Sequence, residues 1–167
     1  MQSDRANRDC IGPDDLEALL RFASATQRAK FPFDAAWHPG DITWSLRGKI
    51  DAIQGLHLWL IKEEVEAAAW FDGPCDLWIE AHPTAQGLIP DIIRWAEEYL
   101  AKSGSNLRVR IFSSDLAQSE ILELLGYSPG DPDMVLMRQD LSRTVPRPKL
   151  PLGMRILDCV GVDLELR

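Results

Sequence analysis

The chain has 167 residues, of which 46% are hydrophobic and 26% charged, with a net charge of −8. This composition is typical of one folded globular domain, and the acidic balance without a basic cluster argues against nucleic acid or an anionic membrane as a partner. The N-terminus is polar and lacks the apolar core of a signal peptide, and no apolar run approaches the roughly 20 residues of a membrane span. The three cysteines are widely spaced. These features predict a cytoplasmic protein with reduced thiols and no metal site.

The first predicted element is a helix over residues 13–29, where a proline and two aspartates stand at the start and leucines recur at helical spacing. Two prolines and a glycine break this pattern in residues 30–41. Residues 42–48 fit a short strand and the end of a helix equally well. Two short apolar runs, 55–61 and 64–71, then predict a strand hairpin.

A third strand is predicted over residues 75–83, where Leu77, Ile79 and Ala81 share one face and Glu80 lies on the other. The elements predicted after it are a helix over 87–102, a strand over 107–112, a helix over 113–126 and a last strand over 133–141. This order predicts an α/β layered domain, with helices flanking a mixed, mostly antiparallel central sheet.

A proline-rich stretch, residues 142–153, predicts an extended linker, and residues 154–160 after it look like a strand again. The sequence from Leu157 to the end, LDCVGVDLELR, runs parallel to RDCIGPDDLEALLR near the beginning when one residue is deleted. Internal duplication explains this similarity, and the alternative is a chance match. The region after the linker is thus interpreted as an orphan strand, residues 154–167.

Several stretches resemble the GNAT (GCN5-related) N-acetyltransferases. ILELLGYSPG at 121–130 resembles the family's closing helix, and LWIEAHPTAQG at 77–87 stands where the family has its central strand and acetyl-CoA loop. WHPGDITWSL at 37–46 and RPKLPLGMRI at 147–156 resemble tandem members of the family. The resemblance implies a GNAT-like domain over residues 8–141, and a second copy whose start is the orphan strand.

In this family, the loop after the central strand holds the pyrophosphate of acetyl-CoA on backbone N–H groups, in the pattern Gln/Arg-x-x-Gly-x-Gly/Ala. Gln86 fits the first position, but Ile89 and Asp91 stand where small residues are expected, and Pro90 lacks an N–H group. The alternative is an ordinary helix start. The residues that the resemblance implies as cofactor-binding are Ala81, His82, Gln86, Gly87 and Leu88.

The catalytic residues of the family are only partly present. The position of the family's general-acid tyrosine is occupied by Leu122, which cannot give up a proton, and Ser114, Ser119 or Tyr127 could replace it only with unusual geometry. Glu80 is the candidate base, because the family places a base on or near the central strand. The alternative for Glu80 is a solvated strand carboxylate.

These observations lead to two hypotheses for function. The first is a GNAT-like domain with a degraded acetyl-CoA loop and no catalytic tyrosine, weakly active or inactive. The alternative is an active acetyl-CoA-dependent N-acetyltransferase acting on a small amine or a peptide amine, with Glu80 as the base. We also expect a homodimer through the C-terminal strand, because an unpaired strand seeks a partner; the same strand could instead fold back and replace the weak first strand near Cys10.

Overall fold

The computed structural model describes residues 5–30, 35–46, 55–101, 104–132 and 149–154. The chain divides into two compact units, Met1–Pro129 and Gly130–Arg167, and all the described helices and strands belong to the first. The expected last strand (133–141), most of the expected linker and all but the first residue of the expected strand 154–160 lie outside the described residues. The domain limits given above therefore stay predictions.

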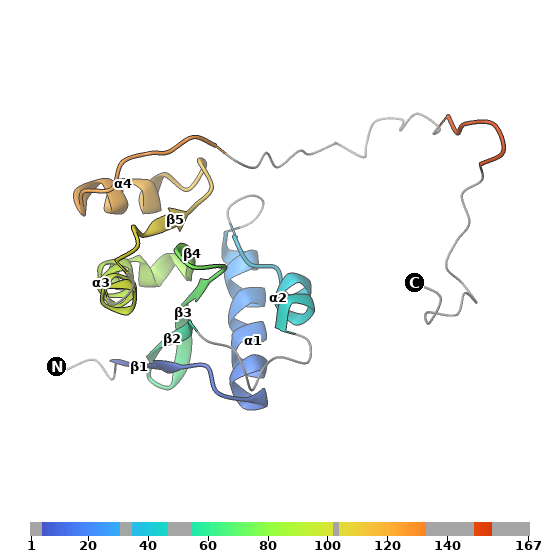
Figure 1. The fold of residues 1–167 in the computed structure, drawn as a ribbon. Helices are drawn as coiled ribbons and strands as arrows, with labels where there is room; N and C mark the ends of the chain where they lie inside the picture. The colour runs from blue at the N-terminus through green and yellow to red at the C-terminus, as the bar shows by residue number, and fades with distance from the viewer. Residues whose placement is uncertain (1–4, 31–34, 47–54, 102–103, 133–148, 155–167) are drawn as a thin grey trace. The chain divides into compact units, whose positions relative to one another are not determined.

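A five-stranded sheet forms the centre of the first unit, in the order β1-β2-β3-β4-β5 (Figure 1). Its strands are β1 (Arg5–Asp9), β2 (Leu56–Ile61), β3 (Glu64–Phe71), β4 (Asp76–Ala81) and β5 (Arg108–Arg110). Neighbouring strands from β1 to β4 run antiparallel to each other, whereas β4 and β5 run parallel. The mixed, mostly antiparallel sheet that the sequence predicts is confirmed, and with it the α/β class.

Helices cover the two faces of this sheet, and each predicted helix is present (Figure 1). They are α1 (Pro13–Ala29), α2 (Pro39–Leu46), the 3-10 helix η2 (Pro83–Leu88), α3 (Ile89–Leu100) and α4 (Leu116–Leu124). The ambiguous stretch, residues 42–48, is helical up to Leu46, where α2 ends. Ile42 and Leu46 are four residues apart and therefore lie on the same side of the helix, and both are buried. η2 connects β4 to α3.

The alternating side chains of β2 build two cores. Leu56, Leu58 and Leu60 pack with α1 and α2 on one face of the sheet, and Trp59 packs with α3 and α4 on the other. The neighbouring strand β3 carries the run Ala67–Ala69, whose three side chains are fully buried between the two cores. Small side chains here allow the helices to pack closely on both faces of the sheet.

A two-residue turn closes the β2–β3 hairpin. Its residues, Lys62 and Glu63, have φ of 53° and 66°, the left-handed backbone conformation of a type I′ turn. This conformation matches the twist of antiparallel strands but is favourable for glycine or asparagine rather than for lysine and glutamate. The hairpin pairing therefore holds the turn in a backbone conformation that its own residues disfavour.

Candidate functional site

Only the first half of β4 is paired with β5, since Asp76, Leu77 and Trp78 lie opposite residues 108–110, the whole of that short strand. The carboxylate of Asp76 fixes this end, since it accepts hydrogen bonds from Arg108 at 2.6 Å and from Arg110 at 3.2 Å. Within the described part of the chain, residues 79–81 have no partner in β5. The second half of β4 is thus separated from its parallel neighbour, and the candidate site begins there.

Glu80 lies in that second half and is completely buried. Its carboxylate pairs with Nζ of Lys30 at 2.7 Å and accepts backbone N–H groups from Ala36 at 2.5 Å and Trp37 at 3.2 Å. Lys30 directly follows α1, and its ammonium also lies 3.2 Å from Asp115, the N-cap residue of α4. This Lys30–Glu80–Asp115 cluster joins α1, β4 and α4, and it excludes the alternative of a solvated strand carboxylate at Glu80.

Two carboxylates share one ammonium in this cluster, and the pKa directions follow from that. Burial alone would lower the pKa of Lys30, but the Glu80 and Asp115 carboxylates outweigh burial and raise that pKa above its ordinary value. Burial raises the pKa of Glu80, and the opposing effects of Lys30 and of the two backbone N–H groups do not cancel it. Lys30 therefore stays charged, while Glu80 gives up its proton less readily than an exposed glutamate.

The residues predicted to bind a cofactor follow Glu80 along β4 and η2 without a break. They are Ala81, His82, Gln86, Gly87 and Leu88. Ala81 and Leu88 are buried, and His82 caps η2 by accepting the backbone N–H of Thr84 at 3.4 Å. A Cβ added at Gly87 would meet nothing within 4 Å, and the buried side-chain oxygen of Gln86 has no hydrogen-bond partner among the described residues. The loop is thus one continuous stretch with room beside its backbone at Gly87.

No family model matches the sequence, and no curated protein matches it significantly. Solved structures do match. A protein from Clostridium difficile 630 described as a possible acetyltransferase superposes with a TM-score of 0.54 at 15% identity, covering 81% of this chain and 98% of that one. A GCN5-related N-acetyltransferase from Sphaerobacter thermophilus gives 0.57 at 20% identity, covering 75% of this chain and 44% of that one. The aminoglycoside N-acetyltransferase AAC(6')-Iy, in complex with a bisubstrate analogue of coenzyme A, gives 0.56 at 12% identity, covering 83% of this chain and 100% of that one. This chain has the GNAT fold.

The helix that precedes Gly126 and Tyr127 is α4. Leu122 is buried in the apolar core, as expected of a leucine there. The nearby Tyr127 donates a hydrogen bond from its hydroxyl to Glu97 at 2.8 Å. Burial first, and then this carboxylate, raises the pKa of Tyr127, so that its phenol stays protonated. The hydroxyl of Tyr127, which follows α4, is thus engaged with Glu97, and Leu122 carries no ionisable group.

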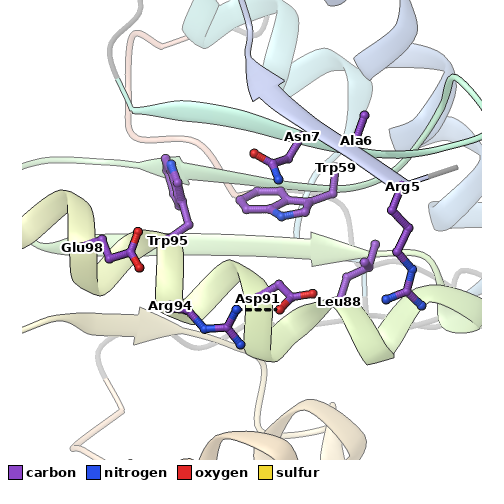
Figure 2. Close-up of a pocket in the computed structure, with 9 residues that line it drawn as sticks. All are labelled: Arg5, Ala6, Asn7, Trp59, Leu88, Asp91, Arg94, Trp95 and Glu98. Carbon is purple, nitrogen blue, oxygen red and sulfur yellow. Dashed lines mark ion pairs between the residues drawn. The ribbon is translucent and has the colours of Figure 1, made fainter. Parts of the chain in front are cut away.

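A cavity of about 410 Å³ lies on the opposite side of the GNAT sheet from Glu80, between β1 and α3. Figure 2 shows the ring of Trp59 across its middle, between Asn7 of β1 and the Asp91–Arg94 ion pair of α3. Trp95 also lines it, and this ring stacks on the imidazole of His57 with the centroids 4.7 Å apart. The cavity therefore has an aromatic floor and a charged rim.

The sequence pattern predicted a strand at Glu80 and a loop after it, and both are present, but it did not reveal their surroundings. Nothing local predicted that Lys30, 50 residues away in the sequence, would pair with Glu80, or that the aromatic residues would border a cavity. Over the described ranges, no three His, Cys, Asp or Glu side chains gather as they would around a metal ion. None of the helices described is both long enough and apolar enough to cross a membrane.

Proposed function

We propose that this chain is a GNAT-like domain whose acetyl-CoA loop is degraded, so that it transfers acetyl groups weakly or not at all. The first turn of α3 carries the proposal. A helix start binds phosphate through free N–H groups and the positive end of the helix dipole. Here Pro90 has no N–H group, and the first turn carries the half-exposed carboxylate of Asp91, which Arg94 neutralises only in part through an exposed ion pair at 3.2 Å. Like charges repel, so this helix start does not fit the anion.

Part of the loop still fits a coenzyme. Gly87 has open space beside its backbone, and the buried amide oxygen of Gln86 has no hydrogen-bond partner among the described residues. Ala81, His82, Gln86, Gly87 and Leu88 therefore remain the residues proposed to contact acetyl-CoA, should any binding persist.

The side chains at the end of β4 and in α4 point to the same conclusion. A general base needs a free, accessible carboxylate within reach of the proton it takes, and Glu80 is fully buried with Lys30 and two N–H groups on its oxygens. A general acid needs an ionisable group, and Leu122 has none. Acetyl transfer would require Glu80 to exchange these partners for the substrate.

Calorimetric titration of acetyl-CoA and of free coenzyme A into the full chain tests the proposal. We expect no binding heat with either ligand up to ~1 mM, the concentration that corresponds to about 4 kcal/mol of binding free energy. Substituting Pro90→Ala together with Asp91→Ala should restore measurable binding. The start of α1 offers a matched control, because Pro13→Ala with Asp14→Ala removes the same pair of residue types from another helix. Micromolar binding by the unmodified chain would refute the proposal.

One observation favours the alternative, an active N-acetyltransferase for a small amine or a peptide amine. Burial raises the pKa of Glu80, and a carboxylate with a raised pKa is a better proton acceptor at neutral pH. In that case coenzyme A should appear when the chain is incubated with acetyl-CoA and an amine such as a lysine-containing peptide. Turnover should then be lost in Glu80→Gln while acetyl-CoA still binds. If Glu80→Gln retains the full rate, Glu80 is not the base.

A further inference from the structure

The Lys30–Glu80–Asp115 cluster lies beside the part of β4 that β5 does not pair, residues 79–81, called here the β4 edge. Glu80 belongs to this part of β4, and Asp115 follows β5 at the start of α4. The ammonium of Lys30 reaches both carboxylates, that of Glu80 at 2.7 Å and that of Asp115 at 3.2 Å. Beyond the paired residues, one cation therefore joins β4 to the segment that follows β5.

This ammonium connects two helices that pack on opposite faces of the sheet. The helix α1 packs in the core that contains Leu58, whereas Leu122 places α4 in the core that contains Trp59. A strand paired along the whole length of β4 would separate a side chain at the end of α1 from the start of α4. Lys30 reaches Asp115 because β5 is too short to cover the β4 edge.

The ion pair shields the β4 edge from solvent. The side chains of Lys30 and Asp115 are only 8% and 11% exposed, and the second oxygen of Asp115 accepts the backbone N–H of Gln118 at 3.1 Å. Thr26 lies one turn before Lys30 in α1. The hydroxyl of Thr26 and the side-chain nitrogen of Gln118 are buried without a hydrogen-bond partner among the described residues. Burial without a partner costs free energy, which an open edge would recover by admitting water or a ligand.

We propose that the Lys30–Asp115 ion pair is a strap that holds the β4 edge closed, and that its release opens the edge to a ligand. The contact with Asp115 is the longer of the two that Lys30 makes, so it is the one that opens. Glu80 keeps its ammonium partner in the open state, and the buried charge stays compensated. The inference rests on the proposed function, because the strap is a second obstacle to acetyl-CoA besides the start of α3.

Amide exchange of Ala81 in the full chain measures the opening directly. His82 donates its N–H to β3, so the N–H of Ala81 points the other way, toward the β4 edge. Asp115→Asn removes the charge of the strap and keeps the helix cap, since asparagine caps as well as aspartate. We expect exchange of Ala81 to become at least tenfold faster in Asp115→Asn, with the β2–β3 hairpin unchanged.

Asp14→Asn is the matched control for this measurement. It removes an exposed charge from the first turn of α1, at the opposite end of that helix from Lys30, and should leave Ala81 protected. Equal exchange of Ala81 in the two variants overturns the strap. Faster exchange in every strand of Asp115→Asn overturns it as well, because the ion pair would then stabilise the whole fold and not one edge.

Titration of acetyl-CoA separates the strap from the start of α3. The variant Pro90→Ala with Asp91→Ala should bind measurably, and adding Asp115→Asn should strengthen that binding at least tenfold, whereas adding Asp14→Asn should not change it. Binding that Asp115→Asn leaves unchanged overturns the strap, even where the repaired helix start binds as expected. Micromolar binding by the unmodified chain refutes the proposed function instead, and exchange of Ala81 then still decides whether the strap exists.

Discussion

Replacing Lys30 with methionine tests whether the buried cluster holds the fold together. The substitution keeps most of the side-chain length and removes the only ammonium that Glu80 contacts within the described structure. Glu80 is fully buried, and Asp115 also loses its contact with this ammonium. Breaking a buried ion pair from one side costs about 3–5 kcal/mol, because the remaining charge is left without compensation. For a chain of this size, that loss lowers Tm by roughly 6 to 20 °C.

The loss should depend on pH in a defined direction. Burial already raises the pKa of Glu80 in the folded chain, and removing Lys30 raises it further. A carboxyl whose pKa is higher in the folded chain than in the unfolded chain stabilises the folded chain when pH is below the unfolded pKa, which is about 4.3 for glutamate. This stabilisation is lost as pH rises through the higher pKa of the folded chain. The difference between Lys30→Met and the unmodified chain is therefore largest near pH 8 and decreases toward pH 4, where Glu80 is neutral in both.

Thermal unfolding followed by circular dichroism at pH 8 and pH 4 measures both effects. Arg21→Met is the matched control, since Arg21 forms an equally short ion pair with Glu17 at 2.6 Å, but on the exposed face of α1. That pair contributes less than about 0.5 kcal/mol. The double variant Lys30→Met with Glu80→Gln should recover most of the loss, because no buried charge at position 80 remains. If Lys30→Met lowers Tm no more than Arg21→Met, or by the same amount at both pH values, the reasoning is refuted.

Three further predictions concern the sheet. His57→Phe keeps the aromatic stacking but removes the contacts with Asp9 and Asn7. We expect the free energy of unfolding to decrease by roughly 1–2 kcal/mol and amide exchange to become faster throughout β1. Amides of β1 that stay protected would contradict this prediction. Burial raises the pKa of the Cys10 thiol from 9.0 to about 11, so this thiol should resist iodoacetamide at pH 8 until the chain unfolds. The free energy of unfolding should also decrease as pH rises from 9 to 11, and rapid labelling of the folded chain would disprove the prediction. Asp76→Asn weakens the hold on two arginine side chains of β5 and should lower Tm and accelerate amide exchange in β5, whereas unchanged exchange would show that the ion pairs do not fix the two strands.

The sequence predicts most of the fold because the signals for helices and hairpins are local. The helix of residues 13–29, the hairpin of residues 55–71 and the alternation around Glu80 all appear in the structure where they were expected. Two features could not be predicted. The strand β1 has no apolar alternation, because its side chains contact solvent and polar partners. The ion pair of Glu80 with Lys30 depends on tertiary packing, which brings residues distant in the sequence together.

The three consecutive alanines at the centre of β3 limit how this chain can change. Their side chains are fully enclosed, with one helical layer beneath each face of the sheet, so that almost any replacement adds volume and forces the layers apart. The half-exposed Asp91 in the first turn of α3, by contrast, can change its charge without disturbing the packing. Substitutions along Ala67–Ala69 are thus limited by size, whereas the exposed positions of the first turn of α3 tolerate changes of charge. A profile built to detect distant homologues should recognise this chain by its pattern of small residues rather than by its loop, and two such proteins could share the architecture long after their chemistry has diverged.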